Sequence, residues 1–238
     1  IFSIDTEFSD PITTYLEIIL TFNFDPSLTG QTIKATEANV FNELKRYVES
    51  NLKQFSGVFR RSELLTQIDD LSGAILNSKA TVKMQQRFIP DLTQSASYDI
   101  YFPVEISSPS TTDNIITSST FIFNNKVCSI KNALSSTKLQ IVDNVGTVEV
   151  DNIGSYDGLN GIVTITGFAP DAITAGVDYV KISCTPGNQA TIRPLRSYIL
   201  DLDEGPSFTT GQIDRQDTEV TLSGNINTGV GVTVSYGS

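Results

Sequence analysis

The sequence predicts an α+β protein: an N-terminal strand-helix-helix-strand unit followed by a mainly antiparallel β region. Three observations predict this class. Residues 15–24 alternate between apolar and polar side chains, residues 36–55 carry apolar side chains at helical spacing, and from Pro90 onward short strand patterns alternate with turn-rich pieces. We therefore expect an α+β unit over residues 1–89 and a β-rich domain over residues 90–238 that ends in an extended tail.

The first strand is expected over Tyr15–Phe24. Turn residues end it at Asp25-Pro26-Ser27, followed by Gly30. The alternation places five apolar side chains on one face and more polar ones on the other, which is typical of a half-buried antiparallel strand. The apolar face consists of Leu16, Ile18, Leu20, Phe22 and Phe24.

The next element is expected to be a helix that is capped by Thr36, with Glu37 in its first turn where the helix dipole favours a negative charge. Glu49 and Lys53 have the i,i+4 spacing of a favourable ion pair. An apolar stripe predicts that one face packs on a sheet. This stripe contains Phe41, Leu44, Val48, Leu52 and Phe55, with Val40 and Tyr47 beside it.

Gly57 interrupts the helical pattern. Ser62 is expected to cap a short second helix, which has apolar residues at Leu64, Leu65, Ile68 and Leu71. After Ser72-Gly73 the period changes to two, with Ala80, Val82 and Met84 on one face, and this predicts a strand that continues towards Phe88.

The chain beyond Pro90 shows no helical pattern. Gly154–Gly161 lies between two alternating segments and predicts a β-hairpin. The ending NTGVGVTVSYGS is interpreted as an exposed strand or as a tail held by a partner. The strand candidates are Tyr98–Val104, Thr120–Phe123, Lys138–Val142, Thr147–Val150, Ile162–Phe168, Tyr179–Cys184 and Glu219–Leu222.

Composition and charge restrict the classes of function. The 238 residues are 39% hydrophobic and 18% charged, which suits a folded protein that needs no disulfide or metal to hold its core. A formal net charge of −11 would repel a phosphate backbone, so no nucleic-acid partner is expected. The apolar runs are too short to span a bilayer and the first residues do not read as a signal peptide, so we expect no membrane insertion.

Few residues offer catalytic chemistry. The chain has no histidine, which removes Ser-His-Asp and Cys-His arrangements and the commonest transition-metal ligand. Cys128 and Cys184 are interpreted as reduced core thiols, with a single disulfide as the alternative. We expect no enzymatic activity, no cofactor and no metal.

Three short patterns have competing interpretations. Asp201, Asp203 and Glu204 resemble a Ca²⁺ or Mg²⁺ cluster but lack the ligand order of a calcium loop, which favours a solvated edge or a basic neighbour. Asp69-Asp70 is interpreted as an exposed helix end. Gly229-x-Gly231 is a lone GxG outside any strand-to-helix context, which is no indication of phosphate binding.

Several motifs follow one another in order over residues 12–205. After the first strand and the long helix come RRSELLTQIDDL, GAILNSKATVKM, QQRFIPDL, YDIYFPVEI, IITSSTFIFNNKVC, IGSYDGLNGIVTITGF and ATIRPLRSYILDLD. This order resembles the baseplate J-like superfamily of contractile phage tails. It is most similar to the C-terminal portion of the baseplate wedge subunit of T-even-type phages, and because the sequence does not begin with Met we expect a piece of such a longer subunit.

The resemblance implies a structural role in the virion. Such subunits form homodimers, contact other wedge proteins and sheath-proximal tail proteins, and join neighbouring wedges into a ring around the tail hub. The ring widens when the baseplate switches and sheath contraction begins. Assembly in the host cytoplasm is implied as well. For the contact surface we select the polar side of the helical unit, with Arg60, Arg61, Lys45, Arg46 and Glu49.

Two other classes of function stay open at this stage. A β-rich module that binds carbohydrate or a cell surface, as in a fibre or adhesin, would suit the Ser/Thr/Gly-rich second half, with exposed loops near Tyr156 as the binding site. The helical unit is unexplained by that interpretation. A metal-dependent hydrolase that uses Asp201 and Asp203 is the third reading.

Overall fold

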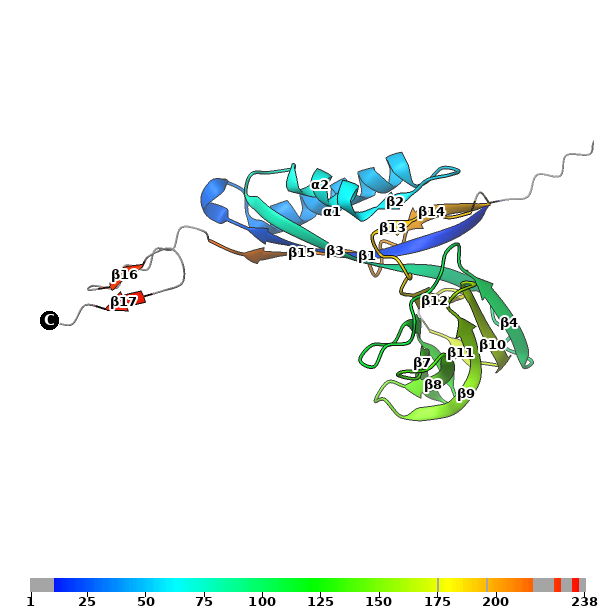
Figure 1. The fold of residues 1–238 in the computed structure, drawn as a ribbon. Coiled ribbons are helices and arrows are strands. Elements are labelled where there is room, and N and C mark those ends of the chain that lie inside the picture. Colours follow the sequence, from blue (N-terminus) through cyan, green and yellow to red (C-terminus); the bar gives the residue numbers. More distant parts are fainter. Residues whose placement is uncertain (1–10, 175, 196, 216–224, 228–232, 236–238) are drawn as a thin grey trace, which may run out of the picture.

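The computed structural model describes residues 11–174, 176–195, 197–215, 225–227 and 233–235. In these ranges the protein has two α-helices and mostly antiparallel strands, which confirms the predicted α+β class. Figure 1 shows two arms: a layer of helices on a sheet, and a β region of curled strands below one end of that layer. No helix among these residues is long and apolar enough to cross a membrane.

Strand β1 (Ile12–Phe24) is the centre of the first arm and contains the predicted strand. It runs antiparallel to β3 (Ile75–Phe88). The predicted apolar faces of both strands are buried: Leu16, Ile18, Leu20, Phe22 and Phe24 on β1, and Ala80, Val82 and Met84 on β3. Burial of one large aliphatic side chain stabilises the fold by about 1.5–3 kcal/mol, so these faces fix which side of the sheet the helices cover. A short 3-10 helix, η1 (Pro26–Leu28), forms the turn after β1.

Helix α1 (Ile33–Asn51) packs on this sheet, but it begins before the predicted cap. Its cap is Thr32, whose hydroxyl accepts a hydrogen bond from the backbone N–H of Ala35 at 3.2 Å. The prediction of Thr36 as the cap is therefore wrong. Thr36 lies inside the helix and donates its hydroxyl to the backbone oxygen of Thr32, which also places Glu37 beyond the first turn.

The buried stripe of α1 differs from the predicted one at its end. Val40, Leu44, Tyr47, Val48 and Leu52 are all buried. Phe55 is 64% exposed, because the helix ends at Asn51 and the chain turns sharply before Gly57. A Cβ atom at Gly57 would lie 2.6 Å from the backbone oxygen of Leu52, so this close turn requires glycine.

Helix α2 (Arg61–Asp69) follows the two-residue strand β2 (Phe59–Arg60). Arg60 is its N-cap and makes no side-chain capping bond, so the prediction that Ser62 caps this helix is wrong. The pairing of β2 with β13 (Thr191–Ile192) determines where α2 begins. Leu64 and Ile68 are buried on the core, whereas the predicted apolar position Leu71 is 38% exposed.

The free side of β1 is covered by two strands from the far end of the chain. Strand β14 (Tyr198–Leu202) pairs parallel with Ile12–Leu16, and β15 (Phe208–Ile213) pairs parallel with Ile19–Phe24. Between them, Ser207 accepts a hydrogen bond from the backbone N–H of Ile18 at 3.0 Å. This bond gives the backbone N–H of Ile18 a hydrogen-bond acceptor in the gap between the two partner strands of β1.

Strand β3 joins the two arms. Its last residues pair with β12 (Val180–Cys184), which pairs with β5 (Ile116–Ser118). From there the sheet continues through β7 (Lys126–Asn132), β8 (Lys138–Asp143), β9 (Val148–Asp157) and β10 (Ile162–Phe168) to β4 (Ala96–Tyr101), while β6 (Phe121–Phe123) pairs with β7 and β11 (Ala172–Ile173). Phe88 at the end of β3 lies 6.1 Å from Phe168, centroid to centroid, so the arms also share packed side chains.

Six of the strand candidates beyond Pro90 overlap an observed strand: Tyr98–Val104, Thr120–Phe123, Lys138–Val142, Thr147–Val150, Ile162–Phe168 and Tyr179–Cys184. The hairpin prediction is confirmed by the antiparallel pairing of β9 with β10, although Gly154 lies inside β9. Glu219–Leu222 and Gly229-x-Gly231 fall outside the described residues. In the predicted tail, β16 (Asn225–Asn227) pairs with β17 (Thr233–Ser235).

The division at residues 89 and 90 stays a prediction. The pairings show that β1 has β3 on one side and β14 and β15 on the other, so the first arm is built from both predicted parts. Cys128 and Cys184 are free and buried, as expected for core thiols. Burial raises the pKa of both thiols, so both favour the protonated form.

Candidate interaction surface

The five residues selected from the sequence lie in two places, and those on α1 are occupied by contacts within the molecule. Lys45 pairs with Glu204 at 2.6 Å, Arg46 with Glu43 at 2.6 Å, and Glu49 with Lys53 at 2.6 Å, the last as predicted. Lys53 also lies 3.1 Å from Asp201. The pairs with Glu204 and Asp201 connect the helical segment to the end of β14. Lys45, which the sequence suggested as a contact for another protein, therefore helps to hold the first arm together.

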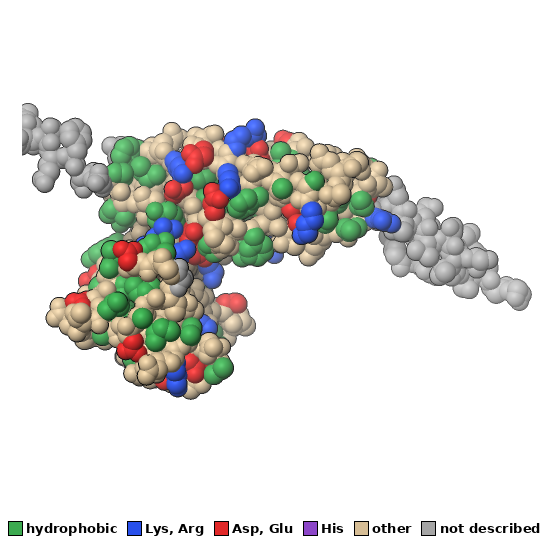
Figure 2. All heavy atoms as spheres, turned by 180° about the vertical axis from the view of Figure 1, so that it is seen from behind, with side chains coloured by type: hydrophobic (Ala, Val, Ile, Leu, Met, Phe, Trp, Pro, Cys, Tyr) green, Lys and Arg blue, Asp and Glu red, His purple; other side chains and the backbone are tan. Residues whose placement is uncertain are grey.

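Figure 2, which views the molecule from behind, shows blue basic and red acidic side chains next to one another over the first arm. The exposed Lys45–Glu204 and Glu49–Lys53 pairs are worth about 0–1 kcal/mol each, because water and salt screen them, whereas the Arg46–Glu43 pair has a buried carboxylate. A partner protein therefore gains little from Lys45, Arg46 or Glu49 unless it replaces the existing pairs.

Arg60 and Arg61 differ from the α1 residues, because in the described part of the chain neither forms an ion pair. The side chain of Arg60 is exposed, while its backbone is held from below by the buried Tyr47 of α1. The Tyr47 hydroxyl accepts from the backbone N–H of Arg60 at 3.0 Å and donates to the backbone oxygen of Arg60 at 3.3 Å. Burial raises the pKa of Tyr47 above its ordinary value, so the hydroxyl keeps the proton that it donates.

The backbone around Arg60 has further support. Phe59 is fully buried, and its ring meets the Tyr47 ring edge to face with centroids 6.2 Å apart. The backbone N–H of Arg61 donates to the oxygen of Ala190 at 2.9 Å. Arg60 is thus an exposed side chain on a rigid support, an arrangement that lowers the entropic cost of binding.

Arg60 lines an open pocket of about 580 Å³ together with residues from two distant segments. Arg193 and Thr191 come from β13 and the residue stretch after it, and Glu105 and Val104 come from the segment after β4. Gly187 and Asn188 complete the wall. Like Arg60, Arg193 has an exposed side chain and forms no ion pair within the described residues.

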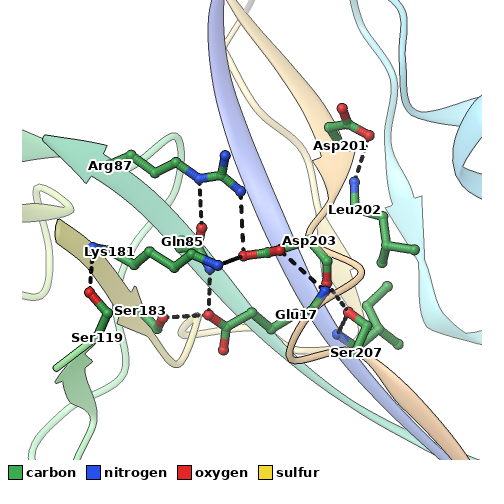
Figure 3. Close-up of polar contacts among 12 residues, drawn as sticks. Glu17, Gln85, Arg87, Ser119, Lys181, Ser183, Asp201, Leu202, Asp203 and Ser207 are labelled. Carbon is green, nitrogen blue, oxygen red and sulfur yellow. Dashed lines mark hydrogen bonds and ion pairs between the residues drawn. The ribbon is translucent and has the colours of Figure 1, made fainter. Parts of the chain in front are cut away.

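A second polar cluster lies where the two arms meet, and Figure 3 shows its side chains converging from several strands. Gln85 of β3 is fully buried and donates to Glu17 and to Asp203, both at 2.7 Å. Asp203 also pairs with Lys181 at 2.5 Å and with Arg87 at 3.4 Å. We call these five residues the ionic junction.

The charges of the ionic junction determine the ionisation of Asp203. Burial alone would raise its pKa, but hydrogen bonds from Lys181 and Gln85 and the charges of Lys181 and Arg87 outweigh burial and lower the pKa below 3.8. The Arg87 guanidinium lies 3.5 Å from the centroid of the Tyr15 ring and 4.9 Å from that of Tyr179. The junction is therefore a charged but well-satisfied cluster, which links β1, β3, β12 and the end of β14.

These contacts decide between the readings of the acidic pattern at the end of β14. Asp203 faces Lys181 and Arg87, Asp201 faces Lys53, and Glu204 faces Lys45, which agrees with the prediction of basic neighbours. Among the described residues, no group of three or more carboxylate or thiol side chains is placed to hold a metal ion. The carboxylates serve as partners for cations of α1, β3 and β12.

The suggested carbohydrate site is not available at Tyr156. This side chain is only 3% exposed, and its hydroxyl donates to the backbone oxygen of Ser107 at 3.2 Å. A larger hollow of about 890 Å³ lies between the helix-free face of the first sheet and residues 107–117, and its lining includes no aromatic ring. Neither position offers the stacking surface on which a sugar ring commonly binds.

The comparison with known protein families bears on the first arm. Residues 13–87 match the family described as baseplate structural protein gp6, C-terminal domain III. The match supports a role as a structural component of a phage baseplate. It extends from β1 through α1 and α2 to β3, and it contains Arg60 and Arg61 but neither Glu105 nor Arg193. A comparison with curated proteins gave no match.

Sequence reasoning found one side of the Arg60 pocket and missed the other. Arg193 belongs to a quoted motif, ATIRPLRSYILDLD, but no periodicity connects it with Arg60. Only the two-residue pairing of β2 with β13 brings them together. The role of Tyr47 was also missed, since its spacing predicts a core aromatic, and its hydroxyl bonds depend on the position of β2.

Proposed function

We propose that this chain is part of a wedge subunit in the baseplate of a contractile phage tail. In this role it contacts itself and other baseplate proteins, and it helps to join neighbouring wedges into the ring that widens when the sheath contracts. The observation that carries the proposal is the baseplate match over residues 13–87, which coincides with the β1-α1-α2-β3 unit. The role requires no catalysis, cofactor, nucleic acid or membrane insertion.

The arrangement of the first arm supports a scaffold role. Its helices cover one face of the sheet, and the opposite face of β1 and β3 carries mixed polar and apolar side chains such as Ile19, Thr81 and Lys83. At the meeting point of the two arms, ion pairs and hydrogen bonds add to the β3–β12 pairing and to the packed side chains that the arms share. A scaffold that changes state needs surfaces of this kind, because mixed contacts can be exchanged without exposure of a large apolar area.

The decisive experiment locates the chain in the particle. Antibodies raised against the purified chain are applied to phage particles, and electron microscopy records where they bind. Labelling at the end of the tail, with a dimer or larger species of the purified chain by light scattering, is the expected result. A monomeric chain whose antibodies leave the tail unlabelled would contradict the proposal.

A second measurement tests the contact residues within that role. Arg60→Glu is expected to reduce the number of complete baseplates, and Arg60→Glu together with Arg61→Glu to reduce it further, because neither arginine forms an ion pair within the described residues. The control with the same change of charge as Arg60→Glu is Lys131→Glu, which changes another cation without an ion pair in the described chain, on β7 of the second arm. Equal losses from both changes would show that charge alone, and not this site, matters.

A further inference from the structure

We propose that the pocket between Arg60 and Arg193 binds a glutamate- and aspartate-rich segment of a neighbouring protein in the assembly. The inference rests on the proposed function, since it names the partner chemistry of one of the surfaces proposed there. It concerns a single pocket of about 580 Å³ and excludes the paired charges of α1.

The first argument is the contrast between paired and unpaired cations. Lys45, Arg46 and Lys53 on the same arm all have an acidic neighbour within 4.0 Å. Arg60, Arg61 and Arg193 have none among the described residues, although the whole chain carries a net charge of −11. These three arginines lie on or directly beside the paired strands β2 and β13, and without an ion pair in the described chain they indicate a site whose counter-charge comes from a partner.

The second argument is geometry. Arg60 lies directly opposite Thr191 in the antiparallel pair, so their side chains are on one face, and Arg193 follows two residues later along the same chain. Both arginines line the pocket together with Thr191. Asn188 uses its side-chain oxygen to accept from the backbone N–H of Ala190 at 2.9 Å, which leaves its NH₂ group as a donor. Two guanidinium groups, with the amide of Asn188 as a neutral donor, suit carboxylates, because a carboxylate can accept two parallel hydrogen bonds from one arginine.

The third argument is that the walls of the pocket are fixed before a ligand arrives. Tyr47 holds the backbone of Arg60 on both sides, at 3.0 and 3.3 Å. The opposite wall is held by the backbone N–H of Gly187, which donates to the oxygen of Glu105 at 2.9 Å, and by the bridge between Ile106 and Pro186. Little order therefore has to be created on binding, which favours a specific contact with a short segment.

Glu105 sharpens the choice of ligand. It is the one acidic residue in the lining and forms no ion pair in the described chain, so it opposes an incoming negative charge. With Arg60 and Arg193 present the pocket stays positive by one charge, which suits spaced carboxylates better than a dense polyphosphate. Removal of the charge of Glu105 should therefore strengthen the binding of an acidic segment, whereas removal of an arginine charge should weaken it.

The experiment uses the full 238-residue chain and a fluorescent peptide of alternating glutamate and serine, with a glutamine–serine peptide as its neutral match. Fluorescence anisotropy at low salt is expected to show saturable binding of the glutamate peptide only. Arg60→Gln and Arg193→Gln are each expected to weaken binding about three- to tenfold, and Glu105→Gln to strengthen it, because each change alters one charge at the pocket. Lys131→Gln is the matched control and is expected to have no effect.

Each outcome decides the matter. Equal binding of the two peptides, equal weakening by Lys131→Gln, or no change with Glu105→Gln would overturn the inference. Arg60, Arg193 and Glu105 are exposed and Lys131 is half-buried, and equal melting temperatures of the variants would show that the fold is intact. The antibody experiment fails or succeeds independently: a chain found on the tail that binds no acidic peptide refutes the pocket alone, whereas an unlabelled tail refutes the proposed function.

Discussion

Asp203 holds more of the molecule together than any other single carboxylate described above. It accepts from Gln85 and Lys181 and lies beside Arg87, while its own backbone N–H donates to the oxygen of Leu16 at 2.9 Å. Its side chain is only 10% exposed. A charge in such a position stabilises the fold only while its cationic partners remain in place.

Replacement of Asp203 by Asn should therefore be costly. Loss of the charge leaves Lys181 and Arg87 without a counter-ion at a partly buried site, and we expect a loss of about 1–3 kcal/mol in the free energy of unfolding. Urea denaturation at neutral pH measures this. The control Glu204→Gln breaks only the exposed pair with Lys45 and should cost less than about 1 kcal/mol. Equal costs would contradict the role given to the ionic junction.

The same variant has a pH dependence with a defined sign. The folded-state pKa of Asp203 is lowered below 3.8, so its contribution is fully present above the unfolded pKa and is lost as the pH falls through the folded pKa. The difference between the native chain and Asp203→Asn should thus shrink only as the pH falls below the ordinary pKa of an aspartate. A difference that already disappears at a higher pH would show that other groups dominate.

At the scale of elements, helix α1 illustrates what periodicity predicts and what it leaves open. The apolar spacing of Leu44, Val48 and Leu52 was sufficient to predict an amphipathic helix on a sheet, because the burial of those side chains dominates its energy. The ends depend on weaker terms. Thr32 and Thr36 are equivalent caps by residue type, and only the path of the chain after η1 selects Thr32.

The two threonines can be separated by mutation. Thr32→Ala should lower the free energy of unfolding by about 0.5–2 kcal/mol, since it removes the acceptor for the N–H of Ala35. Thr36→Val keeps the shape of a buried side chain, removes only a hydroxyl bonded to a helix carbonyl, and should change stability less. Thermal unfolding followed by circular dichroism compares the two. A larger cost at Thr36 would restore the cap predicted from the sequence.

The second-half elements show the opposite balance between sequence and structure. The alternation of Lys138–Val142 and Ile162–Phe168 predicts these strands, since each buries one face. No alternation specifies that β14 and β15 run parallel to β1, because this pairing joins segments that lie far apart in the sequence. The sequence predicted only one of the two arginines of the pocket for the same reason. Arg60 belongs to a local Arg-Arg pair, whereas Arg193 comes close to it only through the β2–β13 pairing.

At the scale of the whole molecule, those long-range pairings predict that residues 1–89 do not fold as a unit. Alone, this fragment lacks β14 and β15, so one edge of β1 has no partner. We expect no cooperative unfolding transition for the fragment by circular dichroism. Addition of a synthetic peptide of residues 197–215 should restore one, and a scrambled peptide should not. Cooperative unfolding of the fragment alone would instead support a domain boundary at residue 89.

The placement of β14 and β15 also has a consequence for biosynthesis. During translation β1 leaves the ribosome before the β region, while the strands that complete its edge, β14 and β15, are made after that region. Until then one side of β1 presents unpaired backbone groups, which favour contacts between nascent chains. Closure of so long a loop is slow. The first arm is therefore completed only after the β region has been made, so its contact surfaces form late relative to those of the second arm.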